Sequence, residues 1–127
     1  MKQPGFWRSM THAWAGLVYT IQTQLNAKIH LCVGFLVMLV ATWLGLDFLH
    51  LSVLVLTIGG VLAGETINTT VESIVDLLSP EWHERAKVAK DVSAAGVLIL
   101  SLTAVIVGLL ILGPPLFERL IHLKFGS

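Results

Sequence analysis

Residues 92–113, VSAAGVLILSLTAVIVGLLILG, contain no Asp, Glu, Lys or Arg over 22 positions. A helix needs about 20 mostly apolar residues to cross the hydrocarbon core of a bilayer. This segment therefore predicts a membrane-spanning helix. Pro114 and Pro115 follow directly, and we expect them to end that helix because proline cannot continue the hydrogen-bond ladder.

Two more apolar segments precede it, at about residues 29–46 and 49–71, and the second of them contains Glu65. Only a short link around residues 45–47 separates these two segments, which indicates an antiparallel pair of helices. Further along, Ser79 and Pro80 have the pattern of an N-cap followed by a first helical residue. We therefore expect the third helix to begin well before its apolar part.

The composition of the 127-residue chain supports a membrane protein. It is 55% hydrophobic and 13% charged, and its mean hydropathy is +0.83. Soluble domains carry about 25% charged residues. The formal net charge of zero gives no reason to expect nucleic-acid binding. We predict an all-α integral membrane protein with three transmembrane helices, formed by residues 1–127 as a single domain.

The N-terminal segment, at about residues 6–27, has a different pattern. Its apolar side chains recur every three or four positions, and polar side chains follow the same rhythm on the other face. The apolar positions are Phe6, Met10, Trp14, Leu17, Ile21 and Leu25. This pattern predicts an amphipathic helix that lies on the membrane surface.

The basic residues predict an orientation. Six of the eight Lys and Arg residues, Lys2 among them, lie before the first apolar segment or between the second and the third. Basic residues concentrate on the cytoplasmic side of a membrane. We expect a multi-pass protein of the cell's inner (cytoplasmic) membrane, with the N-terminus and the loop at 79–91 in the cytoplasm.

Four polar residues of the second segment share one helical face, which we call the acidic stripe: Glu65, Asn68, Glu72 and Asp76. At about 100° per residue they fall within about 80° of one another. Lys90 and Asp91 stand at the start of the third apolar segment, at the same membrane level. An ionisable residue at membrane depth is costly and marks a candidate functional site.

The chemistry of this group favours phosphoryl transfer. Two carboxylates one or two helical turns apart can bind Mg²⁺ and leave its other positions to phosphates. A lysine supplies a point charge for phosphate, and a carboxylate at the lipid edge can take a proton from a lipid hydroxyl. The group therefore indicates phosphoryl transfer from a Mg-nucleotide to a lipid alcohol.

Two motifs carry a resemblance that covers nearly the whole chain: GETINTTVESIVDLLSPEWH at 64–83 and AKVAKDVSAAGVLI at 86–99. They resemble the small prokaryotic integral-membrane lipid kinases, the diacylglycerol kinase and undecaprenol kinase family. The resemblance implies ATP as phosphoryl donor, Mg²⁺ as cofactor, a membrane lipid alcohol as acceptor, and a homotrimer with active sites shared between chains. The motifs lie closer to the undecaprenol kinase branch, but the acceptor, diacylglycerol or undecaprenol, stays open.

The resemblance also implies roles for individual residues. Glu65 matches the general base and Glu72 a metal ligand. The residues implied near the nucleotide are Arg8, His12, Glu72, Asp76, His83, Lys90 and Asp91. Those implied near the lipid are Trp14, Gly16, Leu17, Glu65, Asn68 and Ala94. His30, His50 and His122 are instead expected at the membrane interface, not as ligands.

One position departs from the family pattern. The family has a second metal-binding glutamate in a T-E-R-N-x-[RK]-I-H context, and the corresponding segment here, TQLNAKIH at 23–30, has Gln24. An amide oxygen can ligate Mg²⁺ but brings no charge. The prediction is weaker metal affinity at this position, or an inactive or altered enzyme.

Two other functions compete with the lipid kinase. A small oligomeric channel or transport subunit would use the acidic stripe to line a pathway, and a non-catalytic scaffold would keep only the fold. A pathway needs polar residues across the whole span, whereas here they gather toward one membrane face. That distribution favours a reaction at the surface.

Overall fold

The computed structural model describes residues 5–125, so Lys2, which contributes to the predicted orientation, lies outside the described residues. The described chain forms four helices: α1 (Phe6–Thr23), α2 (Leu25–Trp43), α3 (Phe48–Leu78) and α4 (Glu84–Phe125). It contains no strand between residues 5 and 125. The prediction of an all-α fold is confirmed.

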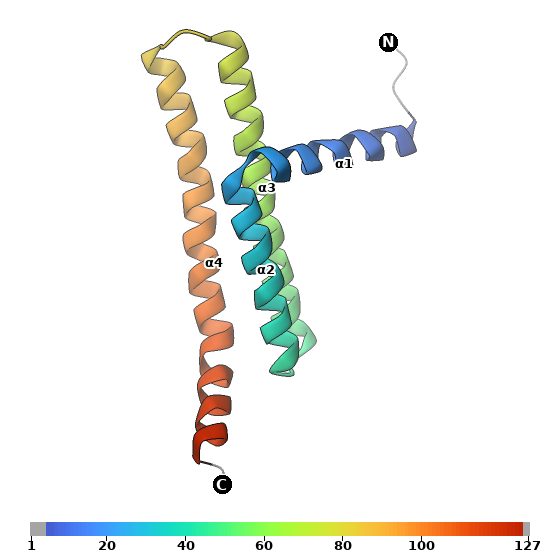
Figure 1. Ribbon diagram of the computed structural model, residues 1–127, viewed down its shortest axis with the longest axis vertical. Helices are drawn as coiled ribbons and strands as arrows, with labels where there is room; N and C mark the ends of the chain where they lie inside the picture. The colour runs from blue at the N-terminus through green and yellow to red at the C-terminus, as the bar shows by residue number, and fades with distance from the viewer. Residues whose placement is uncertain (1–4, 126–127) are drawn as a thin grey trace.

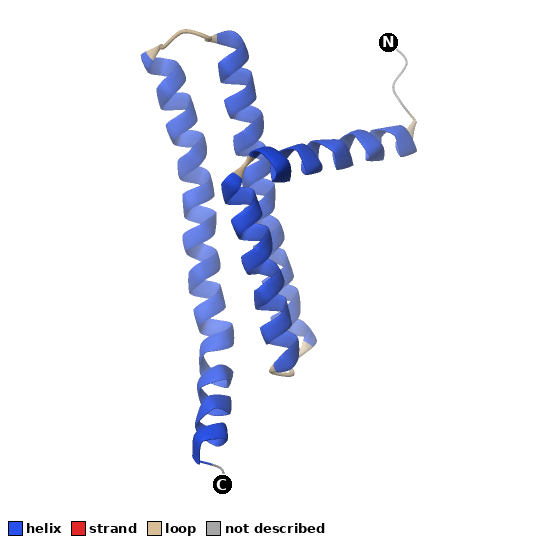
Figure 2. Ribbon diagram, in the orientation of Figure 1, coloured by secondary structure: helices blue, strands red, loops and turns tan. Residues whose placement is uncertain are grey.

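The long helices α2, α3 and α4 run side by side, and α1 projects steeply away from them (Figure 1). α3 packs against both α2 and α4, whereas α2 and α4 touch each other little. Figure 2 shows the short links that join consecutive helices. Three segments are long and apolar enough to cross a membrane: Leu25–Trp43, Phe48–Leu78 and Glu84–Lys124. The three predicted spans are therefore confirmed in number and order.

The distribution of side chains is typical of a protein surrounded by lipid. The fully buried apolar side chains of the described chain are Ala27, Ala41, Leu54 and Val61. The buried polar side chains are equally numerous: Thr20, Glu65, Asn68 and Thr69. Large apolar side chains such as Leu56, Leu109 and Leu110 are exposed on the outside of the bundle. Contact with water would be unfavourable for such an apolar surface, whereas contact with lipid is not. Large apolar groups thus face the surroundings, and four polar side chains are buried within the bundle.

Glycines allow α3 to approach both of its neighbours closely. A Cβ atom on Gly34 of α2 would lie 2.8 Å from Cγ2 of Ile58 on α3. A Cβ on Gly64 of α3 would collide with Leu100 of α4. Small residues at helix contacts are the usual means of close packing in membranes. These two contacts fix how near the helices that carry the polar residues can come.

The turn between α2 and α3 has the form expected from the sequence. Gly45 adopts a positive φ of 72°, a conformation that costs little only for glycine. Asp47 is the N-cap of α3, and its side chain accepts a hydrogen bond from the backbone N–H of His50. The predicted antiparallel pair of helices is confirmed.

The first helix boundary differs from the prediction. The surface helix was expected to reach residue 27, but α1 ends at Thr23 and α2 begins at Leu25. Gln24 between them is extended, with φ −102° and ψ 118°. One extended residue is enough to turn the chain from the direction of α1 into that of α2. The apolar periodicity continues across this corner, so it gave no sign of the break.

The expectation that Ser79 and Pro80 open the third helix is wrong in detail. Ser79 is the C-cap of α3, and α4 begins at Glu84. A proline disfavours the helical conformation in the residue before it, so Pro80 ends α3 at this point. The Ser79 hydroxyl donates to the carbonyl of Glu81 instead of accepting an N–H group. The third helix does begin well before its apolar part, as predicted.

The expectation that Pro114 and Pro115 end the third helix is also wrong. Both prolines lie inside α4, which continues to Phe125. Membrane helices tolerate interior prolines because neighbouring groups compensate for the lost backbone hydrogen bonds. Beyond the prolines, the Arg119 guanidinium lies 5.3 Å from the ring centre of Trp43 on α2. This cation–π contact holds the continued helix against its neighbour.

Candidate active site

The acidic stripe becomes more exposed toward the C-terminal end of α3. Glu65 is 2% exposed and Asn68 is 8% exposed, Glu72 is half-buried, and Asp76 is exposed. The Asn68 amide donates to Glu72 Oε1 at 3.1 Å. The stripe therefore joins a buried carboxylate to carboxylates that a soluble ligand can reach.

Gln24, at the corner between α1 and α2, contacts the middle of the stripe. Its Nε2 amide donates to Glu72 Oε2 at 3.2 Å. Together with the bond from Asn68, each oxygen of the Glu72 carboxylate accepts one amide N–H. The structure thus brings together Gln24 and Glu72, the two residues that the sequence analysis assigned to the metal.

Glu65 contacts a residue that the sequence analysis did not assign to the site. His30 of α2 has its Nε2 atom 3.3 Å from Glu65 Oε1. The same Nε2 atom lies 3.4 Å from the Oγ atom of Ser101 on α4. The sequence does show that His30 and Ser101 are polar residues within apolar segments. It does not show that they face Glu65, because that depends on how α2, α3 and α4 are rotated about their axes.

These side chains line a cleft of about 320 Å³, which we call the Glu65 cleft. Its lining residues are Asn26, His30, Glu65, Asn68, Ala94, Val97, Leu98 and Ser101. Glu65, Asn68 and Ala94 were all predicted to lie near the lipid, and the structure groups them here. The cleft combines apolar side chains, Ala94, Val97 and Leu98, with polar ones that include a single carboxylate, which suits an acceptor that has both a hydrocarbon part and a hydroxyl.

Beyond the Glu65 cleft, two ion pairs occupy the end of the α3–α4 hairpin. Lys90 Nζ lies 2.5 Å from Asp76 Oδ1 and connects α4 to α3. Asp91 instead pairs with Lys87 on its own helix, at 2.6 Å. Exposed ion pairs contribute only about 0–1 kcal/mol, so the phosphates of a nucleotide can compete for these lysines.

His83 lies in the link between α3 and α4. Its Nδ1 atom accepts the backbone N–H of Arg85 at 3.1 Å, which satisfies a free donor in the first turn of α4. The structure therefore gives His83 a local role in starting a helix. Its predicted position near a nucleotide stays a prediction.

The residues predicted on α1 separate into two groups. Leu17 is half-buried, and Gly16 lies where α1 crosses α3. Arg8, His12 and Trp14 are exposed on α1, which projects away from the bundle (Figure 1). Within residues 5–125, no hydrogen bond or ion pair of the acidic stripe involves these three side chains. One chain alone therefore does not bring them to Glu65.

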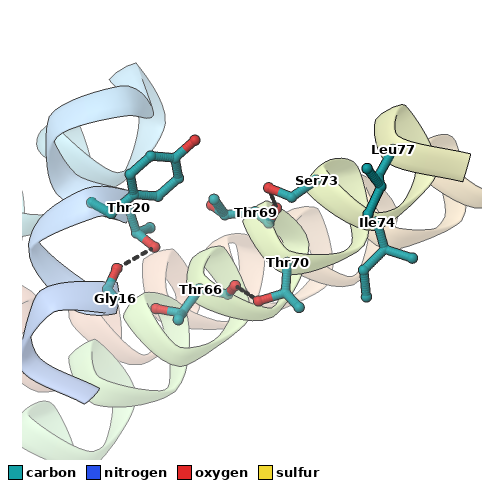
Figure 3. A pocket seen from close by; sticks show the side chains of 9 residues that line it. Gly16, Thr20, Thr66, Thr69, Thr70, Ser73, Ile74 and Leu77 are labelled. Atoms are coloured by element: carbon teal, nitrogen blue, oxygen red, sulfur yellow. Dashed lines mark hydrogen bonds between the residues drawn. The ribbon is translucent and has the colours of Figure 1, made fainter. Parts of the chain in front are cut away.

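Gly16 lines a second crevice (Figure 3), which shares no lining residue with the Glu65 cleft. The residues drawn with it are mostly hydroxylated: Tyr19, Thr20, Thr66, Thr69, Thr70 and Ser73, with Ile74 and Leu77. Each threonine and serine hydroxyl among them donates to a carbonyl four residues earlier on its own helix. These five hydroxyls of the crevice therefore have no proton left to donate to a ligand.

The oxygen atoms around Glu72 are suitable ligands for a magnesium ion that arrives with a nucleotide. No group of three His, Cys, Asp or Glu side chains in the described chain could hold a metal ion. Mg²⁺ is commonly held by one or two carboxylates together with substrate phosphates. Asn68 Oδ1 is buried and has no hydrogen-bond partner among the described residues, so an amide oxygen is available beside the Glu72 carboxylate.

Comparison with known proteins finds a family and named relatives that match most of this chain. The model of the family named prokaryotic diacylglycerol kinase matches residues 11–112, a range that contains Gln24, the acidic stripe and Lys90. The chain is 41% identical to a diacylglycerol kinase of Synechocystis over 119 residues, which cover 93% of this chain and 68% of that relative.

Two further relatives carry the two names that the sequence analysis considered. The chain is 33% identical to the undecaprenol kinase of Bacillus subtilis over 87% of this chain and 90% of that relative. It is 34% identical to the diacylglycerol kinase of Escherichia coli over 84% of this chain and 82% of that relative. Since these matches span most of its length, the chain belongs to the prokaryotic diacylglycerol kinase family.

Proposed function

We propose that this protein transfers the γ-phosphate of Mg-ATP to the primary hydroxyl of a membrane lipid alcohol, either diacylglycerol or undecaprenol. Family membership makes it a lipid kinase by class. The observation that carries the proposal is the buried Glu65 carboxylate in a cleft of polar and apolar side chains, beside an accessible acidic stripe. This arrangement suits a reaction between a lipid and a soluble nucleotide.

Glu65 is the general base of the proposed reaction. The lipid hydroxyl enters the Glu65 cleft and gives its proton to the carboxylate as its oxygen bonds to the γ-phosphorus. The bond between that phosphorus and the bridging oxygen breaks, and ADP leaves. The apolar walls of the cleft keep water away, which limits hydrolysis of ATP as a side reaction.

Glu72, with the amides of Gln24 and Asn68, is the proposed position for the metal and the nucleotide phosphates. Mg²⁺, when bound, neutralises charge on the phosphates. Lys90 exchanges Asp76 for phosphate oxygens, and Asp76, Asp91 and His83 surround the nucleotide. Positioning and electrostatics supply most of the catalysis in phosphoryl transfer.

The projection of α1 supports the proposal of shared sites. Arg8, His12 and Trp14 do not contact the acidic stripe of their own chain. In a homotrimer, the amphipathic α1 would lie along the membrane surface and carry these residues toward a neighbouring chain. The proposed topology has α1 and the link between α3 and α4 on the cytoplasmic face of the inner membrane, where ATP is present.

The test is transfer of labelled γ-phosphate from Mg-ATP in mixed micelles that contain either diacylglycerol or undecaprenol. We expect the unaltered chain to label one of the two lipids. The Glu65→Gln variant should lose about 10²- to 10⁴-fold of that rate, the usual contribution of a general base. Glu118→Gln, which alters a carboxylate of α4 beyond its two prolines, is the matched control and should keep the full rate.

The better-labelled lipid assigns the acceptor. No labelling of either lipid, at any Mg²⁺ concentration, would contradict the proposed reaction and favour a non-catalytic member of the family. Equal rates for the unaltered chain and Glu65→Gln would instead remove the role of Glu65.

A further inference from the structure

The histidine beside Glu65 has no part in the reaction described so far. The carboxylate is 2% exposed and the His30 side chain is 27% exposed, so water has little access to the contact between them. Glu65 Oε1 is buried and lacks a hydrogen bond of good geometry in the described chain. A buried carboxylate oxygen without a donor is costly. His30 Nε2, 3.3 Å away, is the group best situated to supply one.

The contacts of Ser101 favour a hydrogen on Nε2 of His30. The Ser101 hydroxyl donates to the carbonyl of Val97 at 2.8 Å, so its single proton is already used. Its oxygen therefore presents lone pairs to His30 Nε2 at 3.4 Å. The ionised Glu65 carboxylate also has only lone pairs to offer. Beside an ionised Glu65, a bare Nε2 would face lone pairs from two sides, so this arrangement favours the form of His30 that carries a hydrogen on Nε2.

We propose that His30 is a positioning residue for Glu65. The one hydrogen on Nε2 is shared between Glu65 Oε1 and the Ser101 oxygen, and this shared contact keeps the ring edge turned toward the carboxylate. With one carboxylate oxygen anchored, the other, Oε2, is left for the proton of the acceptor hydroxyl. Fixing a catalytic group in its productive direction lowers the barrier by removing unproductive orientations.

Membership of one cleft supports this role. His30, Glu65 and Ser101 come from three different helices, yet all three line the Glu65 cleft. The histidine therefore acts at the wall of the cavity that would receive the acceptor hydroxyl. This inference rests on the proposed function and names a residue to which the resemblance assigns no role.

The molecule contains its own control. His50 also pairs with a carboxylate, Asp47, at 2.6 Å, but both side chains are exposed and belong to the first turn of α3. Removing His50 therefore deletes the same type of pair without touching the Glu65 cleft. If the loss of any histidine lowers activity, variants of both His30 and His50 will show it. If only the contact with Glu65 matters, activity will fall only in the His30 variant.

The experiment compares His30→Leu, His30→Gln and His50→Leu in the phosphate-transfer assay. We expect kcat of His30→Leu to fall by about 10- to 100-fold, the scale of a misdirected catalytic group, while KM for lipid and for ATP stays within about twofold. His30→Gln should recover most of the loss, because its amide can donate from nearly the same position. His50→Leu should match the unaltered chain.

A merely structural role gives a different pattern. His30→Leu and His30→Gln would then both change KM, lower the thermal midpoint and show no rescue, and this result would overturn the inference. A kcat of His30→Leu equal to that of the unaltered chain would overturn it as well.

Nitrogen NMR of histidine-labelled protein in bilayers tests the bond without any turnover. We expect the His30 Nε2 resonance to be that of a protonated nitrogen and to move in Glu65→Gln but not in Asp47→Asn. A bare Nε2, or a resonance indifferent to Glu65→Gln, would overturn the inference. If the unaltered chain transfers no phosphate, the proposed function fails, and the NMR result still decides whether His30 donates to Glu65.

Discussion

Two carboxylate–histidine pairs, one at the N-terminus of α3 and one past its middle, stand in opposite settings. At its N-terminus, Asp47 and His50 are 65% and 49% exposed and lie three positions apart in sequence. In the Glu65 cleft, the Glu65 carboxylate is 2% exposed, and its histidine comes from another helix. The first pair follows from local sequence alone, whereas the second exists only because α2 packs on α3.

The two pairs also differ in what they stabilise. The Asp47 carboxylate accepts the backbone N–H of His50 and so satisfies a free donor at the start of α3. The Glu65 carboxylate satisfies no helix end and is instead buried at an energetic cost. A costly arrangement that does not serve folding indicates function. The same type of substitution should therefore reduce activity more in the Glu65 region than at the Asp47–His50 pair.

The largest difference is expected from removing one negative charge at each end of α3. Glu72→Gln takes away the carboxylate that would meet the metal and sets an NH₂ group against the amides of Gln24 and Asn68. We expect kcat/KM for ATP to fall by about 100-fold. Asp47→Asn should stay within about twofold because it only adjusts a helix cap. Phosphate-transfer rates per mole of folded protein measure both, and equal losses would contradict the comparison.

The second effect concerns Gln24, where the family pattern has a glutamate. Gln24→Glu would set a carboxylate against Glu72 in place of the present amide bond. We expect its thermal midpoint to fall in EDTA and to recover with Mg²⁺, because a cation relieves the repulsion. The Mg²⁺ concentration for half-maximal transfer should fall by about tenfold, since a second charged ligand raises affinity.

Gln22→Glu is the matched control for this change. Gln22 is exposed near the end of α1, two positions before the corner. It should alter neither the midpoint in EDTA nor the Mg²⁺ requirement. If Gln24→Glu behaves like Gln22→Glu, position 24 does not belong to a metal site.

The sequence was sufficient for the helices but not for all of their ends. Long apolar runs leave no alternative to helices in a membrane, so three spans could be predicted from composition and length. The continuation of α4 past Pro114 and Pro115 could not, because it depends on tertiary packing such as Arg119 on Trp43.

The site was predictable to the same extent. The acidic stripe follows from helical periodicity within one segment, and the resemblance supplied its roles. The contacts of Glu65 with His30, and of Glu72 with Gln24, cross between helices. They depend on how each helix is rotated about its axis, and one sequence does not determine that rotation. His30 was therefore interpreted as an interface residue.

A smaller effect is expected from the spacing of α2 and α3. Gly34 lies one turn after His30, and a methyl group there would lie 2.8 Å from Ile58 Cγ2. Gly34→Ala should therefore separate the helices, cost about 1–3 kcal/mol and lower kcat several-fold by loosening the contact between His30 and Glu65.

Gly59→Ala is the control for this spacing, because nothing lies within 4 Å of the added atom. It should gain up to about 1 kcal/mol from improved helix propensity. Thermal midpoints and transfer rates of the two variants test the difference. If the thermal midpoints of Gly34→Ala and Gly59→Ala move in the same direction, α2 and α3 are not tightly packed at Gly34.

The smallest effect belongs to the exposed pair and depends on pH. The backbone N–H of His50, and then its side chain, hold the pKa of Asp47 below its ordinary value of 3.8. A carboxyl whose pKa is lower in the folded state stabilises the fold above its ordinary pKa. That contribution disappears as the pH falls through the lowered value.

The Asp47→Asn variant keeps a capping oxygen but cannot ionise. We therefore expect the unaltered chain to melt slightly above Asp47→Asn at pH 6, and this difference to shrink as the pH falls below 3.8. A difference that stays constant below pH 3.8 would mean that the charge of Asp47 does not contribute to this end of α3.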